Sequence, residues 1–164
     1  MMLSPRLQDA LNKQINAEFE SSYLYLSMAA WFEAEDLKGM AHWMHIQSGE
    51  ETGHGMRIFD FINDCNGRVA LTAIETPKSQ WKSATEVFED AYAHEQKISA
   101  MLNDLMNLAG AEKSGATHDF LEWFLREQVE EESQAELIVA QLKRVGDSGV
   151  GLYLLDQELG KRGK

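Results

Sequence analysis

Glutamate and histidine residues recur in this sequence at spacings that suit a shared metal site. A first set consists of Glu18, Glu51 and His54, with spacings of 33 and 3 residues. An offset of 77 residues maps this set onto a second one with the same spacings, which consists of Glu95, Gln128 and Glu131. Such a repeat is expected when two similar helix pairs direct polar side chains to one centre.

The short spacing within each set has a direct chemical meaning. Residues three apart in a helix lie on one face about one turn apart, so Glu51 and His54 can reach a common point. A carboxylate can bridge two metal ions while an imidazole completes the ligands of one of them. A lone Glu-x-x-His pair is a weak indication, because a histidine on an apolar face is more often hydrogen-bonded in the core. The repeated offset favours metal.

The elements that would position these residues are predicted to be helices. Only two prolines occur, and Ala, Leu, Glu, Gln, Lys and Met, which favour helices, dominate the stretches between glycine-bearing breaks. Ser4 with Pro5 and Ser83 with Glu86 match the patterns of helix starts. The chain is therefore predicted to be all-α, with helices over about 5–35, 38–66, 83–110, 117–145 and a short 150–160.

The lengths of the connections predict the topology. Short links near 37–39 and 110–115 make the first two helices antiparallel neighbours, and likewise the third and fourth. The long connection over 67–82 makes a crossover between helices two and three, which then run parallel. We expect one domain over residues 1–164, a four-helix bundle with a short fifth helix. Each apolar helix face is interrupted near its middle by a member of the two sets, and carboxylates buried there require a cation or protons.

Charge and composition narrow the classes of partner. The chain has 27 Asp and Glu residues against 15 Lys and Arg, a net charge of −12, which disfavours nucleic acid and suits hard cations. The basic cluster of Lys161, Arg162 and Lys164 is predicted to be a solvated tail. A single cysteine, Cys65, excludes an intramolecular disulfide. With no long apolar run and no signal-peptide pattern, we expect a cytoplasmic protein without a membrane partner.

Five segments carry a resemblance to a known family: NAEFESSYLYLSMAAWF, GEETGHGMRIFDFI, AYAHEQKI, FLEWFLREQVEEE and GLYLLDQEL. On these motifs, which extend over essentially the whole chain, the sequence resembles a bacterial-type non-haem ferritin. The resemblance implies iron storage, with oxidation of Fe(II) by O2 or peroxide at a di-iron centre within each subunit. It also implies a homo-oligomer, a hollow 24-subunit cage with the fifth helix at a fourfold axis.

The resemblance also implies roles for individual residues. It makes Glu18, Glu51 and His54 the ligands of a first iron, with Glu51 bridging to a second. Glu95 and Glu131 would hold the second iron. Gln128 is expected to lie nearby as a poor ligand, and Tyr25 matches the tyrosine beside the centre.

Two further acidic groups match ferritin features, and each has a simpler explanation. Glu50, Glu127 and Glu130 match an accessory third iron site, but a run of glutamates is also typical of a solvated helix face. Asp119 and Glu122 match the acidic pair lining a threefold channel for cations. The simpler explanation is that they complement the dipole in the first turns of a helix, but we favour the channel because the cage is implied independently.

Some positions depart from related families. Thr52 stands where bacterioferritins carry the methionine that binds haem, so no haem is expected. The second set ends in Glu131 where bacterioferritins have a histidine. Gly49, Gly53 and Gly55 in the second helix could permit close packing or local mobility next to His54. The alternative functions are a DNA-protecting mini-ferritin-like protein and a di-iron oxygenase subunit.

Overall fold

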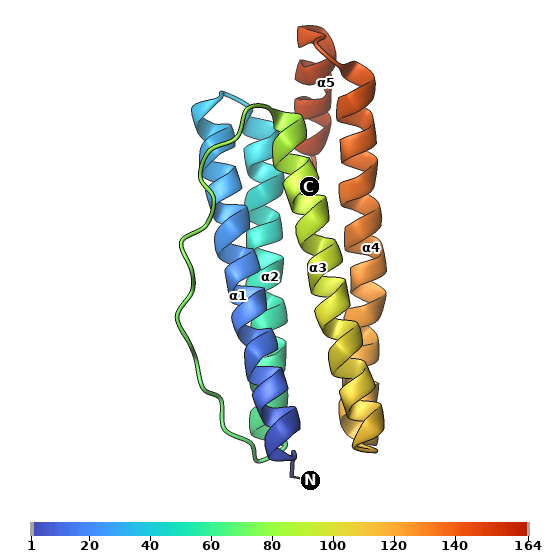
Figure 1. Cartoon of the computed structure of the whole chain (residues 1–164). Helices are drawn as coiled ribbons and strands as arrows, with labels where there is room; N and C mark the ends of the chain where they lie inside the picture. Colours follow the sequence, from blue (N-terminus) through green and yellow to red (C-terminus); the bar gives the residue numbers. More distant parts are fainter. Residues whose placement is uncertain (1, 164) are drawn as a thin grey trace.

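The computed structural model describes residues 2–163, and within these residues it contains five helices and no strand (Figure 1). The helices are α1 (Pro5–Ala34), α2 (Lys38–Asp64), α3 (Ala84–Ala111), α4 (Gly115–Val145) and α5 (Gly149–Leu159). Every predicted helix is present, and each boundary lies within two residues of its predicted position. The all-α prediction is confirmed.

The two predicted helix starts are formed as expected. The Ser4 side chain accepts a hydrogen bond of 3.1 Å from the Leu7 amide, at the start of α1. The Ser83 side chain accepts one of 3.2 Å from the Glu86 amide, at the start of α3. Each serine thus satisfies an amide that has no partner within its helix.

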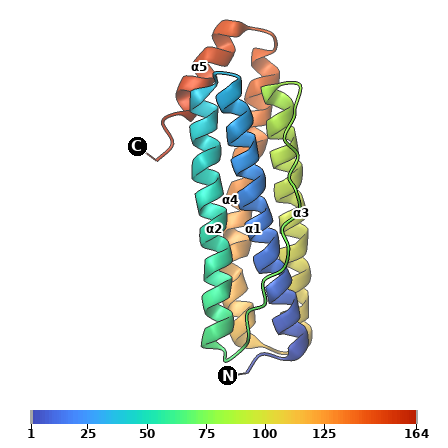
Figure 2. The same ribbon diagram turned by 90° about the vertical axis from the view of Figure 1, so that its left-hand side faces the viewer.

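The bundle has the predicted topology. Helices α1 and α2 form one antiparallel pair and α3 and α4 form another, and the crossover between α2 and α3 follows the full length of the bundle (Figures 1 and 2). Two side chains of α1 hold this crossover. Gln8 accepts from the Arg68 amide at 2.8 Å, and Asn12 both accepts from the Ala70 amide and donates to the Arg68 carbonyl.

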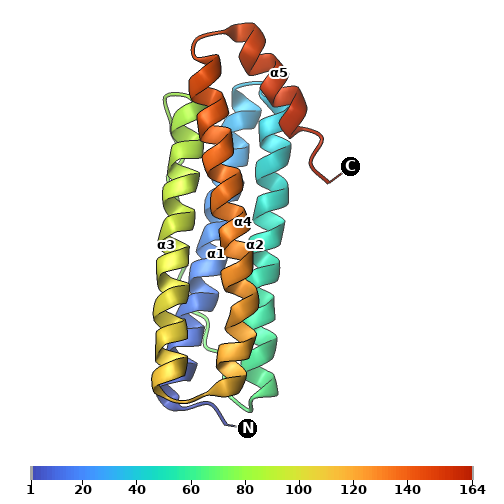
Figure 3. The same cartoon turned by 90° about the vertical axis from the view of Figure 1, so that its right-hand side faces the viewer.

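The short helix α5 turns back from the end of α4 and packs against α2 (Figure 3). Its buried Asp156 accepts a hydrogen bond of 2.8 Å from the Met40 amide, and so caps the start of α2, where Leu37 provides no side-chain cap. The approach is close, because a Cβ on Gly39 would lie 1.7 Å from the Asp156 carbonyl oxygen. The fifth helix therefore packs on its own chain.

The apolar core consists of two separate clusters. One lies around Phe32, Met44 and Phe88 near the α5 end of the bundle, and the other around Leu11 and Ile58 near the opposite end. The buried polar side chains between them include Gln14, Glu18, Ser21, Gln47, Glu51, His54, Glu95 and Gln128. A polar layer thus crosses the middle of the bundle, where the sequence predicts it.

None of the helices in residues 2–163 combines the length and the apolar character needed to cross a bilayer.

The glycines of α2 differ from one another in their surroundings. A Cβ on Gly55 would meet the Phe19 ring at 2.6 Å, whereas Gly49 and Gly53 have open space around them. Close packing therefore explains Gly55, and nothing in the structure explains the other two.

Candidate metal centre

The polar layer brings together side chains from all four long helices. Glu18 comes from α1, Glu51 and His54 from α2, Glu95 from α3 and Glu131 from α4. Two triads of possible ligand atoms result, in each of which the atoms lie within 4.8 Å of one another: Glu18, Glu51 and His54, and Glu51, Glu95 and Glu131. Glu51 belongs to both triads, as a bridging carboxylate must.

The first triad is held by contacts on its own helices. Gln14 donates to Glu18 Oε1 at 2.7 Å, one turn earlier on α1. His54 Nδ1 lies 3.3 Å from Glu51 Oε2 and 3.9 Å from Glu18 Oε2. One nitrogen and two oxygens therefore face a common point, a donor set suited to a borderline divalent cation.

The second triad consists of carboxylates alone. Tyr25, which is fully buried, donates its hydroxyl hydrogen to Glu95 Oε1, and Gln128 donates to Glu95 Oε2 at 2.7 Å. Gln47 donates to Glu51 Oε1 at 2.9 Å and to Glu131 Oε1 at 3.3 Å. Gln128 therefore supports a possible ligand with its amide nitrogen.

Burial favours the protonated form of these carboxyl groups. Desolvation, reinforced by neighbouring carboxylates, raises the pKa of Glu51 from 4.5 to about 8 and that of Glu131 to about 10. Desolvation also raises the pKa of Glu95 and, well above its ordinary value, that of Glu18. Glu131 Oε2 is buried without a hydrogen-bond partner among residues 2–163. An unpaired oxygen beside several desolvated carboxyl groups fits a bound cation.

The centre opens to one side of the bundle. A pocket of about 660 Å3 between α2 and α4 is lined by His54 and Glu131 from the centre, and also by Glu50, Glu127 and Glu130. The oxygens of the last three do not converge within 4.8 Å in the part of the chain that the structure describes. Glu50 instead pairs with Arg162 at 2.6 Å, so the third iron site remains a prediction.

The prediction of a solvated C-terminal tail is wrong for Arg162. Its side chain is only 18% exposed, and its guanidinium lies 4.3 Å from the centre of the Trp43 ring. The neighbouring Lys161 is 68% exposed, as predicted. Lys164 lies outside the described residues.

The predicted channel residues lie away from the centre. Asp119 and Glu122 are exposed near the start of α4. The Glu122 carboxylate is 3.7 Å from both His118 Nδ1 and Arg126 Nη1 on the same helix. Their role in a channel stays a prediction.

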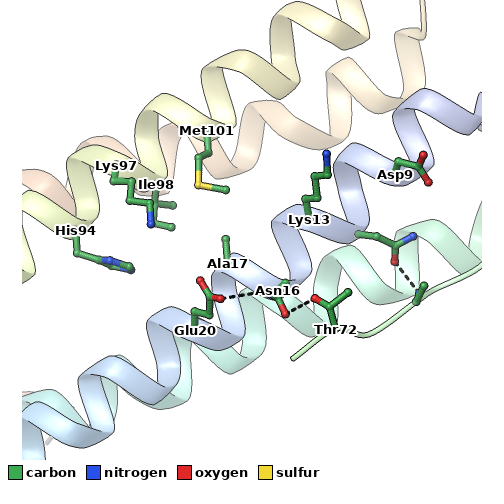
Figure 4. A pocket seen from close by; sticks show the side chains of 12 residues that line it. Asp9, Lys13, Asn16, Ala17, Glu20, Thr72, His94, Lys97, Ile98 and Met101 are labelled. Atoms are coloured by element: carbon green, nitrogen blue, oxygen red, sulfur yellow. Dashed lines mark hydrogen bonds between the residues drawn. The ribbon is translucent and has the colours of Figure 1, made fainter. Parts of the chain in front are cut away.

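A second pocket, of about 520 Å3, lies on the opposite side of the bundle, between α1 and α3 (Figure 4). His94 of α3 borders this pocket, and its Nε2 lies 2.7 Å from the Ser21 hydroxyl, which donates to the Ala17 carbonyl. The buried His94 ring thus has a hydroxyl partner on α1. Burial, with a smaller effect of Lys97, lowers the pKa of His94 to about 4.

Sequence reasoning missed three supporting residues, Gln14, Gln47 and Arg162, and it did not single out His94. A signal for two of them was present, because Gln14 and Gln47 are 33 residues apart, the same spacing as Glu18 and Glu51. The offset of 77 does not extend to them, since it leads to Ala91 and Phe124. No sequence signal marks Arg162 or His94.

Comparisons with known proteins agree with this geometry. The ferritin-like domain family matches residues 8–145. The bacterial non-heme ferritin of Bacteroides fragilis is 45% identical, covering 98% of this chain and 100% of its own, and that of Staphylococcus saprophyticus is 42% identical, covering 98% and 96%. An open pore ferritin from Archaeoglobus fulgidus is 44% identical, with a TM-score of 0.98 over 99% of both chains. The chain therefore belongs to the ferritin family.

Proposed function

We propose that this protein is an iron-storage ferritin with ferroxidase activity. The observation that carries the proposal is the pair of triads that share Glu51 inside the bundle, with an unpaired oxygen on Glu131. Glu18, Glu51 and His54 would bind one Fe(II), and Glu51, Glu95 and Glu131 a second. The names of the related bacterial and archaeal ferritins support iron as the metal.

The reaction uses iron as substrate. Two Fe(II) ions give up one electron each, and O2 takes both electrons and two protons to become hydrogen peroxide. When peroxide is the oxidant, it takes two electrons and two protons and yields two water molecules. The protein contributes paired binding, which lets the oxidant receive both electrons at one place. Tyr25 and Gln128 orient Glu95, and Gln47 orients the other two carboxylates of the second triad.

Storage of the product requires an assembly, and we propose the hollow 24-subunit cage. Val150, Tyr153 and Leu154 of α5 are each more than 60% exposed, which leaves apolar surface for contacts between subunits. The exposed pair Asp119 and Glu122 would then line the channel by which Fe(II) enters.

We propose the cytoplasm as the location of the protein. The free, buried Cys65 suits this reducing compartment.

No observation favours the alternative functions. A net charge of −12 disfavours the DNA-protecting alternative, and both triads form within one chain. An oxygenase subunit would need an organic substrate and a reductase partner, whereas the related bacterial and archaeal proteins are named ferritins.

Aerobic addition of two Fe(II) per subunit tests the proposal. The expected result is fast oxidation with two irons consumed per O2, in a particle that sediments as a large assembly. His54→Ala should abolish fast paired oxidation, whereas Glu131→Ala should leave one iron bound and mainly slow the reaction, because imidazole strengthens the first site. Glu136→Gln, an exposed change on α4, is the matched control. Slow oxidation equal to that of free Fe(II), or a monomer in sedimentation, would contradict the proposal.

A further inference from the structure

Arg162 makes an unusually complete set of contacts for a residue two positions from the end of the sequence. Its Nη2 donates to Glu50 Oε2 at 2.6 Å and to Gln47 Oε1 at 2.9 Å, and its Nη1 donates to the Trp43 carbonyl at 3.3 Å. Its own carbonyl lies 2.9 Å from His42 Nε2. The guanidinium is thus fixed against α2 from several directions.

The contact with Gln47 connects Arg162 to the metal centre. Gln47 is 2% exposed, and its amide has one accepting end and one donating end. A guanidinium has only donors, so the oxygen of Gln47 must face Arg162. The NH2 group then faces inward, where it donates to Glu51 and Glu131. The guanidinium therefore fixes the orientation of the amide at its outer end.

We propose that Arg162 is a positioning residue for the second metal triad and that it acts through Gln47. By holding the amide in one orientation, it keeps an N–H directed at an oxygen of the bridging Glu51 and at an oxygen of Glu131. Without Arg162, the amide can rotate and place its oxygen beside carboxylate oxygens. The inference rests on the proposed metal centre and extends it to the C-terminal segment.

The geometry requires arginine at this position. One guanidinium reaches the Trp43 carbonyl, Gln47 and Glu50 together, and its central carbon lies over the Trp43 ring. A lysine can pair with Glu50 as a point charge but cannot reproduce this fork or the stacking. The docking of α5 on α2 through Asp156 brings the C-terminal segment to this place.

Calorimetric titration with Zn2+, which is not oxidised, tests the inference on the whole assembled protein. The two binding events are assigned by their loss in His54→Ala and Glu131→Ala. Direct partners of metal ligands contribute about 10- to 100-fold in affinity, so Arg162→Gln, one contact further out, should weaken the second event about 3- to 10-fold. The first event should weaken less than the second, because the first triad contacts Gln47 only through Glu51 and because Gln14 supports Glu18 independently.

Three matched variants separate positioning from charge and from anchoring of the tail. Lys161→Gln removes the neighbouring exposed charge and should leave both events unchanged. Arg162→Lys should still weaken the second event, and wild-type affinity in this variant would show that charge alone suffices. In a Gln47→Leu background, Arg162→Gln should have no further effect, whereas an undiminished loss there would overturn the inference. Failure of the wild type to bind two Zn2+ would instead refute the proposed metal centre.

Discussion

Metal binding at the centre should release protons, and raising the pH from 6 to 8 should strengthen it. At pH 7, a carboxyl group with the pKa of about 8 of Glu51 keeps its proton in about nine of ten molecules. Glu131, with a pKa of about 10, keeps its proton almost always. Because metal ligands must be deprotonated, loading both triads should release about two protons per subunit from these residues. The pKa values of Glu18 and Glu95 are raised in the same direction.

The size of the pH effect follows from the number of protons displaced. Each displaced proton makes binding about tenfold tighter per pH unit, or about 1.4 kcal/mol, until the pH reaches the pKa of the group. Between pH 6 and 7, the summed free energy of loading both triads should therefore become about 3 kcal/mol more favourable, provided that Glu51 and Glu131 both lose their protons.

Calorimetry with Zn2+ in buffers of different ionisation enthalpy, at constant pH, measures the protons released. Glu131→Gln preserves the shape of the side chain but carries no titratable proton, so it should release about one proton fewer. Glu136→Gln, on the exposed side of the same helix, should release as many as the wild type. Tight binding of two Zn2+ at pH 7 without proton release would refute the reasoning, because the buried carboxyl groups would then already be ionised.

The same pKa shifts predict the opposite trend for the stability of the metal-free protein. A carboxyl group whose pKa rises on folding stabilises the fold fully below its unfolded value, and this contribution is lost as the pH rises through the folded value. For Glu51 the loss runs from about pH 4.5 to about 8, and for Glu131 it continues to about 10. The Tm of the metal-free protein should therefore fall between pH 6 and 9, whereas that of the loaded protein should fall less.

Three further predictions concern other parts of the chain. Asp156→Ala should lower the free energy of unfolding by about 1 to 2 kcal/mol, because α2 loses its cap. Asp156→Asn keeps an accepting oxygen, so thermal denaturation should show a smaller loss for this variant. Gly49→Ala should raise the free energy of unfolding by up to about 1 kcal/mol, because open space surrounds Gly49. Gly55→Ala should lower it, because the added methyl group would collide with the Phe19 ring. Equal effects of the two changes in denaturant titrations would contradict the packing argument. Replacing Asp119 with Asn and Glu122 with Gln together should slow Fe(II) uptake at low iron and weaken its salt dependence, as measured by stopped flow. Unchanged kinetics would mean that both residues only complement the dipole at the start of α4.

Local sequence patterns were sufficient to predict the helices. Ser4 and Ser83 cap through atoms three residues away, and helix formers fill the segments between breaks, so nearby residues contain the necessary information. The contacts that fix the periphery are different in kind. Asp156 caps a helix 116 residues earlier in the chain, and Asn12 holds a crossover 56 residues later, and no local pattern encodes such pairings.

The residues of the candidate centre could be predicted because their spacing repeats along the chain. The residues that hydrogen-bond to them could be predicted only in part. The triads reproduce the grouping expected for Glu18, Glu51 and His54 on one side and for Glu95 and Glu131 on the other. Gln14 and Gln47 each lie one turn before a glutamate of the first triad, and their spacing of 33 residues could have revealed them. Support from Arg162 depends on the path of the last residues after α5, and this path is a tertiary property.

The division of the apolar core by the polar layer bears on how the family can diversify. The two clusters stabilise opposite ends of the bundle, and the layer between them contributes chemistry at a cost in stability. Substitutions at one end are separated from those at the other by this layer, so their effects on folding should add with little coupling. Selection can therefore adjust the exposed apolar surface of α5 while the polar layer at the middle of the bundle stays the same.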